Sequence, residues 1–404
     1  MAGRYHVVFA VWLLTVVNYM ERVVIGFAGP SIMHSLHIEP KTFGIVLSSF
    51  ALGYFLAQIP GGLIADRWGA RRVLIIGPLF WALFTGITGL VSTVGAIVAV
   101  RLCFGLAEGL SNAATYKAIG DNFDVKERAK AAAIWVTAFA VAPAFTGPLV
   151  GLLLASFPWQ SVFIMLAVPA ILVAFANRVL LPAASVTPRV SMAKDTASFR
   201  ELLRLPSLWL IGSAFSLWNI AFWGFLGWMP SYLALERHID IKATGMLGGI
   251  PYVFALVGLV LTGWLGSGPL HRHRPQFLAA LYLLACASLY CAYAAGTLAG
   301  SLAGLSAAAL FIYSALSMYG AIVLDLAPEK ARAAYSGIVS AIGQIGSVVA
   351  PSVIGYLVTA SGTFASGFIF MVSALCIAAL CALALVPLSP ASKPLGVPAP
   401  NSSI

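Results

Sequence analysis

The sequence predicts an all-α membrane protein in which twelve transmembrane helices form two pseudo-symmetric six-helix bundles. Three observations lead to this prediction. The chain is 61% hydrophobic and only 9% charged, whereas soluble domains are about 45–50% apolar and about 25% charged. Apolar stretches long enough to cross the roughly 30 Å hydrocarbon layer recur twelve times. One long polar segment separates the first six stretches from the last six.

The predicted spans follow one another with mostly short connections. The first is interpreted as a retained span, because no small-residue cleavage site follows its apolar run, as a secretory signal would require. In order, the spans are 5–28, 43–64, 73–93, 96–118, 131–154, 161–181, 207–231, 245–266, 276–296, 300–324, 333–358 and 364–387.

The spacing of the spans gives a plan of two domains. Residues 1–181 form the N-terminal bundle, 182–206 a cytoplasmic inter-domain loop, and 207–387 the C-terminal bundle. The last residues, 388–404, are rich in Pro, Ser and Ala and are predicted to be a disordered cytoplasmic tail. Within the loop, residues 199–205 have the pattern of a short amphipathic helix on the membrane face.

Basic residues indicate the orientation of the chain, because Lys and Arg accumulate in cytoplasmic loops. With both termini cytoplasmic, only three basic residues fall in outside loops: Lys41, Arg237 and Lys242. The inside segments hold Arg4, Arg67, Arg71, Arg72, Lys126, Arg128, Lys130, Arg189, Lys194, Arg200, Arg204, Arg272, Arg274, Lys330, Arg332 and Lys393. This topology accounts for the net charge of +10, so nucleic acid is not expected as a partner. We expect a monomer in a bacterial inner membrane.

The remaining chemistry-bearing residues give no sign of a metal, a cofactor or an enzyme. The cysteines lie in predicted spans without CxxC spacing or a nearby histidine, as expected of small buried hydrophobes; they are Cys103, Cys286, Cys291, Cys376 and Cys381. The sequence contains no nucleotide-binding loop and no pattern of a catalytic triad.

Four charged residues stand well inside the predicted spans: Glu21, Arg22, Arg101 and Glu108. An ionised side chain near the bilayer centre costs at least about 2.5–3.5 kcal/mol, so such residues face a cavity and pair with one another. Arg101 and Glu108 are seven residues apart and share one helix face. Asn112 lies one turn further along this face.

Asn18 and Arg22 are likewise one turn apart on the first span. A purely structural pair between the first and fourth spans remains the alternative, although membrane helices usually associate through small residues. The functional interpretation is an anion site in which arginine holds a carboxylate and glutamate carries a proton. No histidine maps to membrane depth, so Glu21 and Glu108 are the predicted proton sites.

The loop after the second span resembles that of the major facilitator superfamily. "GGLIADRWGARR" matches the family's loop motif at Gly62, Asp66, Arg67, Gly69, Arg71 and Arg72, and "RLCFGLAEG" resembles its fourth-span motif. The resemblance implies a central cavity and alternating access by rocking of the bundles. We expect Asp66 to meet the positive end of a neighbouring inner helix and the motif to latch the cytoplasmic side.

"NYMERVVIGFA" is similar to the first-span signature of the anion:cation symporters, a family within that superfamily. "FALGYFLAQIPGG", "DVKERAKA" and "GWMPSYL" are further similarities. The resemblance implies proton-coupled uptake of an organic carboxylate, with Glu21 and Glu108 as coupling acids. It assigns Arg22 and Arg101 to the carboxylate and the proton sites, and Tyr54 to the pocket.

Two residues depart from the pattern of sugar-acid members. Phe139 stands where those members often carry Gln, and Ser340 where they often carry Asn. Asn219 and the aromatic residues around it form the predicted C-terminal side of the pocket, although aromatic residues in a span more often pack or face lipid. We therefore expect a smaller or flatter carboxylate, either short and aliphatic or aromatic, to be preferred over hexonates and hexuronates.

Other interpretations stay open from sequence. A drug or metabolite exporter of the same fold would exchange its substrate for protons, and a sugar-acid permease would differ only in substrate. A signalling or structural membrane protein would carry no flux. The buried arginines argue against export of cationic drugs.

Overall fold

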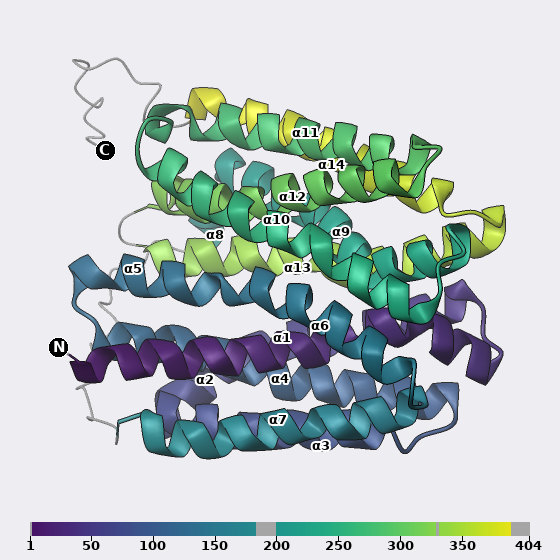
Figure 1. Ribbon diagram of the computed structural model, residues 1–404. Coiled ribbons are helices and arrows are strands. Elements are labelled where there is room, and N and C mark those ends of the chain that lie inside the picture. Colours follow the sequence, from purple (N-terminus) through teal and green to yellow (C-terminus); the bar gives the residue numbers. More distant parts are fainter. Residues whose placement is uncertain (1, 183–198, 329–330, 389–404) are drawn as a thin grey trace, which may run out of the picture.

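The computed structural model describes residues 2–182, 199–328 and 331–388. Within these ranges the regular elements are all helical (Figure 1). Twelve helices are long and apolar enough to cross a membrane, which confirms the predicted fold class. Most of the inter-domain loop (183–198) and nearly all of the tail (389–404) lie outside the described residues.

The helices run in the predicted order. They are α1 (Ala2–Leu36), α2 (Pro40–Trp68), α3 (Ala70–Thr88), α4 (Val94–Asn122), α5 (Val125–Val136), α6 (Ala138–Leu154), α7 (Trp159–Leu180), α8 (Phe199–Leu203), α9 (Pro206–Ser231), α10 (Ile241–Ser267), α11 (Arg274–Ala294), α12 (Leu298–Leu326), α13 (Arg332–Ser361) and α14 (Ala365–Ala384). A π-helical turn, Tyr232–Glu236, extends α9, and two short 3-10 turns, His271–His273 and Val386–Leu388, complete the set. The short α8 lies where the amphipathic helix is predicted.

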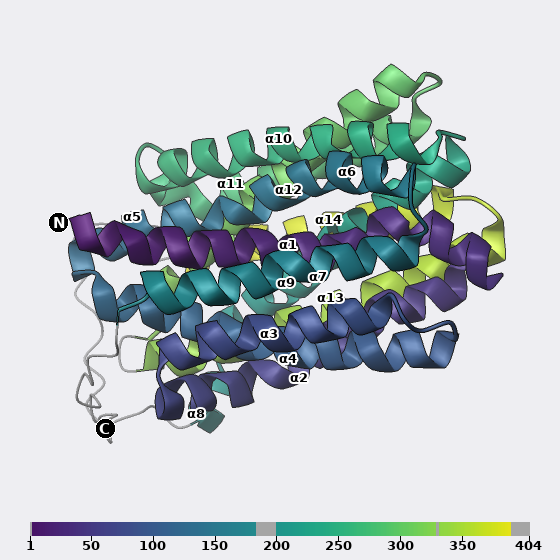
Figure 2. The ribbon, with the colours of Figure 1, turned by 60° about the horizontal axis from the view of Figure 1, so that its bottom comes forward.

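Helices α1–α7 pack mainly among themselves, and so do α9–α14. The two sets meet along α2 and α13, along α6 and α10, and along α1 and α9. Figures 1 and 2 show the long helices running roughly side by side, with the described start of the chain at one end of the molecule. We call the opposite end, which holds the connection between α1 and α2, the distal end.

Most helix boundaries lie within five residues of the predicted ones, and two differ by more. The first helix continues eight residues beyond residue 28, to Leu36, and includes Pro30. A proline removes only one backbone donor, and the remaining bonds of this long buried helix hold it together. The fifth span begins earlier than expected and is interrupted at Thr137, between α5 and α6.

Helices α2 and α4 are in direct backbone contact, and this contact positions residues on one side of the interior. A Cβ atom at Gly109 would lie only 2.6 Å from the Tyr54 carbonyl oxygen. Gly105, one turn earlier, would meet the Phe50 carbonyl oxygen in the same way. The glycines of the fourth-span motif therefore bring Phe50 and Tyr54 of α2 against the charged face of α4.

Close glycine contacts also join the two sets of helices toward the distal end. On α6 and α10, a Cβ atom at Gly245 would come within 2.5 Å of both the Gly147 carbonyl oxygen and the Gly151 Cα atom. On α2 and α13, Ser352 Oγ donates to Ser48 Oγ at 2.8 Å. The distal end is thus closed by backbone packing that has no room for a larger side chain.

We predict that Gly245→Val disfavours this closed arrangement, because the facing atoms belong to the backbone and cannot rotate away. Overpacking of this kind costs about 1–3 kcal/mol, equivalent to about fivefold or more in the ratio of open to closed molecules. The measurement is the rate at which a membrane-impermeant maleimide labels Cys in a Ser48→Cys variant that lacks the native cysteines. Ser48 is only 8% exposed in the closed state.

The matched control is Gly95→Val, because a Cβ atom at Gly95 would meet no described atom within 4 Å. Labelling should rise in the Gly245 variant and stay unchanged in the control. Equal labelling rates in the two variants would contradict the role given to the glycine contact.

Candidate functional site

A cavity of about 160 Å³ lies between the two sets of helices. Its lining residues come from α1 to α6 on one side and from α9, α12 and α13 on the other. Along α1 the lining runs from Arg22 back to Leu14, toward the end of the molecule where the described chain starts. Beyond Arg22 in the distal direction, Gly26 packs against the backbone of Gly227. The cavity is therefore sealed distally, just past Arg22.

Helix α1 contributes Asn18, Tyr19 and Arg22 to the lining. Their spacing places them on one helix face, as predicted for Asn18 and Arg22. Arg22 is 6% exposed, so its charge is almost fully removed from solvent. A buried guanidinium needs a partner, because the cost of an unpaired buried charge is large.

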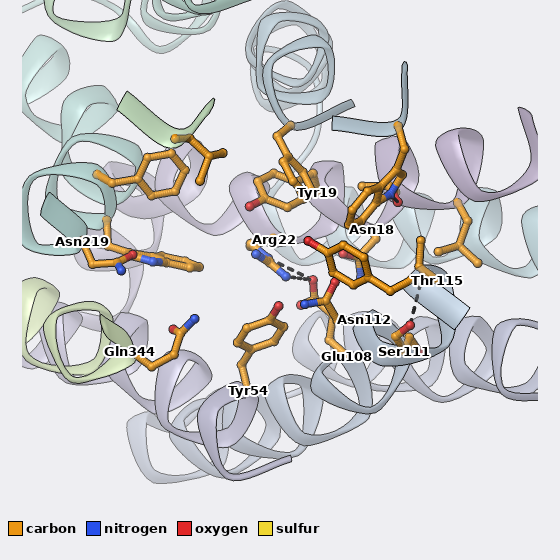
Figure 3. A pocket seen from close by; sticks show the side chains of 18 of the residues that line it. Asn18, Tyr19, Arg22, Tyr54, Glu108, Ser111, Asn112, Thr115, Asn219 and Gln344 are labelled. Carbon is orange, nitrogen blue, oxygen red and sulfur yellow. Dashed lines mark hydrogen bonds and ion pairs between the residues drawn. The ribbon is translucent and has the colours of Figure 1, made fainter. Parts of the chain in front are cut away.

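Glu108 of α4 is that partner. Arg22 Nε donates to Glu108 Oε1 at 2.9 Å, and Arg22 Nη2 donates to the same oxygen. The guanidinium also lies 4.3 Å from the centre of the Tyr19 ring and 4.8 Å from that of Tyr54. Figure 3 shows Arg22 held between these two rings, with the Glu108 carboxylate beside it. The predicted contact between the first and fourth spans is thus a desolvated ion pair on the cavity wall.

The second oxygen of Glu108, Oε2, has no hydrogen-bond partner among the described residues. The amides of Asn18 and Asn112 also line this side of the cavity. Glu108 therefore has one buried oxygen without a partner, on the side of the cavity that these amides line.

Glu21 and Arg101 lie behind this wall, and neither lines the central cavity. Glu21 is fully buried, and neither of its carboxylate oxygens makes a hydrogen bond of normal geometry with a described residue. An ionised carboxylate in such a place is costly, so the site favours the neutral acid. Arg101 lies 4.5 Å from the Phe104 ring centre, and with Arg22 it lines a second cavity of about 20 Å³. The four charges thus occupy two adjoining places rather than one.

The opposite side of the cavity is aromatic with two amides. Helix α9 contributes Asn219 to it, together with Trp218, Phe222 and Trp223. Phe139 of α6 lines the cavity from the side of α1, where its ring centre lies 4.7 Å from that of Tyr19. Aromatic residues in a membrane span more often face lipid or pack against other helices, but Trp218, Phe222 and Trp223 line the cavity. Trp228 does pack, and its Nε1 donates to the Pro351 carbonyl oxygen at 3.2 Å.

Sequence reasoning did not identify Gln344, which lines the cavity from α13. Ser340, the predicted residue, lies one turn away and is not part of the lining. The two residues share a helix face, because four residues separate them. Testing the polar neighbours of Ser340 at this spacing would have found Gln344.

The loop motif lies at the end of α2 and the start of α3, and none of its residues belongs to the cavity lining. Gly69 has a φ of 82°, a conformation that favours glycine. Arg71 donates to the carbonyl oxygens of Arg178 and Leu181 at the end of α7, at 2.7 and 2.9 Å. Asp66 pairs with Lys117 of α4 at 3.5 Å, where the sequence analysis expected the start of a helix.

The rest of the motif is more open. The side chains of Arg67 and Arg72 are exposed. A Cβ atom at Gly62 would meet no described atom within 4 Å. In this conformation the motif braces α3 against α7 and α2 against α4. Its expected action as a latch stays a prediction.

Comparisons with known proteins agree with this architecture. Residues 11–320 and 271–402 match the family model of the Major Facilitator Superfamily. The hexuronate transporter of Bacillus subtilis is 24% identical over 380 residues, covering 90% of each chain. A probable L-galactonate transporter of Escherichia coli is 28% identical over 373 residues, covering 86% of this chain and 82% of its own.

Among solved structures, a bacterial homolog of the human lysosomal transporter Spinster, described as inward-facing and occupied, superposes with a TM-score of 0.79. The two chains are 18% identical, and the match covers 96% of this chain and 98% of that one. At this identity the likeness concerns the fold.

We predict that Arg22→Gln lowers the thermal stability of the protein, because it leaves Glu108 as an unpaired buried charge. Breaking a buried pair from one side costs about 3–5 kcal/mol. The double variant Arg22→Gln/Glu108→Gln should recover most of the loss, since no charge then remains unpaired. Thermal unfolding of the purified variants in detergent measures both effects.

The control is Arg272→Gln, at an exposed arginine in the turn before α11, which should leave the unfolding temperature unchanged. The destabilisation of the single variant should also shrink at low pH, where Glu108 takes up a proton. A double variant no more stable than the single one would show that the ion pair is not what Arg22 contributes.

Proposed function

We propose that this chain, which belongs to the Major Facilitator Superfamily, is a transporter that carries an organic carboxylate across the membrane together with protons. Its family and its relatives are transporters rather than enzymes, and the twelve apolar helices make it a multi-pass membrane protein. The names of the relatives support an organic acid as the substrate. The site explains how such a substrate would be coupled to protons.

The observation that carries the proposal is the ion pair between Arg22 and Glu108. Arg22 is the cation of the central cavity among the described lining residues, and it is the natural partner for a substrate carboxylate. In the empty site, however, Glu108 already occupies Nε and Nη2 of Arg22. A carboxylate can replace Glu108 without stranding a buried charge only when Glu108 takes up a proton.

This competition couples the two ligands. Protonation of Glu108 frees Arg22, the substrate carboxylate then pairs with Arg22, and the net charge of the site stays the same. Binding of an anion and uptake of a proton therefore favour each other, as linkage requires. A carrier that releases both on the other side of the membrane is a symporter.

Glu21 and Arg101 extend the same logic behind the cavity wall. Arg101 Nε and Nη1 have no hydrogen-bond partner among the described residues, and neither have the oxygens of Glu21. Both side chains are buried behind the cavity wall, where charges are weakly screened, so a change in the protonation of Glu21 would alter the field at Arg101. We assign Glu21 as a second proton site, and Arg101 as the residue that responds to it.

The orientation follows from the basic loops. Lys41, Arg237 and Lys242 belong to the distal end, whereas the basic clusters after α2, α4 and α10 belong to the other end. By the positive-inside rule, the distal end faces outward and both termini are cytoplasmic. Because the distal end is closed, this conformation faces inward. We propose that the protein works as a monomer in a bacterial inner membrane. Alternating access requires the glycine contacts of the distal end to separate.

A sugar acid is the second candidate substrate, because relatives are named for hexuronate and galactonate. It leaves the coupling mechanism unchanged and differs in what the rest of the cavity must recognise. Export by proton exchange is disfavoured, because protonation of Glu108 opens the anion site instead of closing it.

We predict that the wild-type protein binds its carboxylate more tightly as the pH falls through the titration of Glu108. Below this range Glu108 is neutral and Arg22 is free, and above it the two residues pair and exclude the ligand. The Glu108→Gln variant should bind with an affinity that hardly depends on pH, because Arg22 is always free. Isothermal titration calorimetry measures both, using the carboxylate that gives the largest thermal shift in a panel.

The control is Glu201→Gln, which changes an exposed acidic residue of α8 and should retain the wild-type pH dependence. If wild-type affinity were the same across the pH range, Glu108 would not gate the anion site.

A second prediction concerns transport itself. In proteoliposomes an acidic exterior should drive accumulation of the same carboxylate by the wild-type protein. Glu108→Gln should lose gradient-driven accumulation yet retain exchange of internal for external substrate, because exchange needs no net proton movement. Accumulation that depends on sodium and not on pH would contradict proton coupling, and faster efflux into an acidic exterior would favour an exporter.

A further inference from the structure

Two rows of contacting aromatic rings line the cavity, one from each set of helices. The first ring row consists of Tyr116, Trp135, Phe139 and Tyr19. Adjacent ring centres in this order lie 4.8, 5.3 and 4.7 Å apart. All four residues belong to the cavity lining.

The second ring row runs along α9 through Phe215, Trp218, Phe222 and Trp223. The centre of Phe215 lies 5.5 Å from that of Trp218, and Trp218 lies 4.8 Å from Phe222, in both cases with stacked rings. Phe222 meets Trp223 edge to face at 6.0 Å. These four residues also line the cavity, so the rows face it from opposite sides.

Both ring rows end at Arg22. The guanidinium lies 4.3 Å from the ring centre of Tyr19, the last member of the first row, and 5.5 Å from that of Trp223, the last member of the second. A ligand carboxylate at Arg22 therefore places the atoms attached to it between two aromatic surfaces. Aromatic surfaces gain most from another ring, through stacked or edge-to-face contact.

The size of the cavity agrees with a single ring. A volume of about 150 Å³ is enough for one benzene molecule, and this cavity measures about 160 Å³ and opens toward the end where the described chain starts, so a single ring fits between the rows. The polar side chains of the lining lie on the Glu108 side, such as Ser111 and Asn112, or at Asn219 and Gln344, so a polyhydroxy acid held between the ring rows would turn several hydroxyl groups toward aromatic surfaces. Each hydroxyl left without a hydrogen bond costs about 1–3 kcal/mol. The lining thus favours a flat apolar body.

The side-chain amides of Asn219 and Gln344 lie on the other side of Arg22 from the Glu108 carboxylate (Figure 3). Asn219 Nδ2 donates to the carbonyl oxygens of Phe215 and Gly343, at 3.1 and 3.2 Å, which leaves Oδ1 as an acceptor. Ser347 Oγ donates to Gln344 Oε1 at 2.8 Å, and the Gln344 amide nitrogen points into the cavity in Figure 3. One donor and one acceptor are thus available on the same side.

A hydroxyl group placed between the two amides would satisfy both, because it can accept from one and donate to the other. We infer that the substrate is an aromatic monocarboxylate that carries a ring hydroxyl group away from the carboxylate. The carboxylate binds Arg22, the ring lies between the two ring rows, and the hydroxyl pairs with Gln344 and Asn219. This inference rests on the proposed function, since it requires Arg22 to be the carboxylate site.

The test compares four acids by isothermal titration calorimetry on the purified full-length chain at a pH below the titration of Glu108. The acids are 4-hydroxybenzoate, benzoate, trans-4-hydroxycyclohexanecarboxylate and glucuronate. Loss of the hydroxyl, as in benzoate, should weaken binding about fivefold. Loss of aromaticity, as in the cyclohexane acid, should weaken binding about two- to tenfold. Glucuronate should bind more weakly than either aromatic acid.

A variant separates the contribution of the amide from that of the rings. Gln344→Leu should bind 4-hydroxybenzoate and benzoate equally, while benzoate binding at the wild-type level shows that the site is intact. The matched control is Gln160→Leu, because Gln160 lies on α7 outside the cavity lining. This control should keep the preference for the hydroxylated acid.

The outcomes distinguish this inference from the function on which it rests. Glucuronate binding more tightly than both aromatic acids would overturn the aromatic substrate and leave a carboxylate transporter in place. A hydroxyl preference that survives Gln344→Leu would overturn the assignment of the amide. If no acid of the panel binds, both the inference and the proposed carboxylate function are wrong.

Discussion

The buried ion pair between Arg22 and Glu108 is the interaction on which the rest of the site depends. Each charge alone would be costly at this depth, and each is tolerated because the other lies beside it. The pairing also makes the site exclusive, since the arginine that attracts an anion is already engaged by an acid of the protein. A single proton on Glu108 changes that state. In the proposed mechanism, the cost of an unpaired buried charge makes binding of the anion and binding of the proton mutually dependent.

The surrounding fold holds this pair in place and limits access to it. Glycines of α4 let α2 approach closely enough for Tyr54 to lie against the guanidinium. Further glycines close the distal end, so that the cavity is sealed beyond Arg22. These contacts depend on the absence of side chains and contribute no chemistry of their own. In the proposed transport cycle these backbone surfaces would separate as the cavity opens on the distal side.

The sequence was sufficient for the fold and for the charged centre. Twelve apolar stretches predicted the helices, and the energetic cost of charge in a membrane singled out Arg22 and Glu108 before any contact was known. The predicted end of α1 fell short of Leu36, because the helix continues through Pro30, where only one backbone donor is missing. The interruption at Thr137 had no clear signal in the sequence.

Tertiary placement could not be predicted in the same way. Glu21 is adjacent to Arg22 in sequence, yet it lies on another face of α1, behind the cavity wall. On α9, sequence reasoning did select Asn219 and its aromatic neighbours for the pocket, and only packing shows that Trp228 of the same group lies outside the lining. Gln344 lines the cavity because of how α13 packs against the other helices, which the sequence pattern of α13 does not reveal. Periodicity identifies which residues share a face, while packing decides what that face meets.

The most direct test of this account is the number of protons that the protein takes up when a carboxylate binds. In weakly buffered detergent solution, near the titration range of Glu108, the account predicts net uptake of a proton as the acid anion binds, and loss of this uptake in the Glu108→Gln variant. Binding with no change in proton content, or with proton release, would contradict the exchange of partners at Arg22.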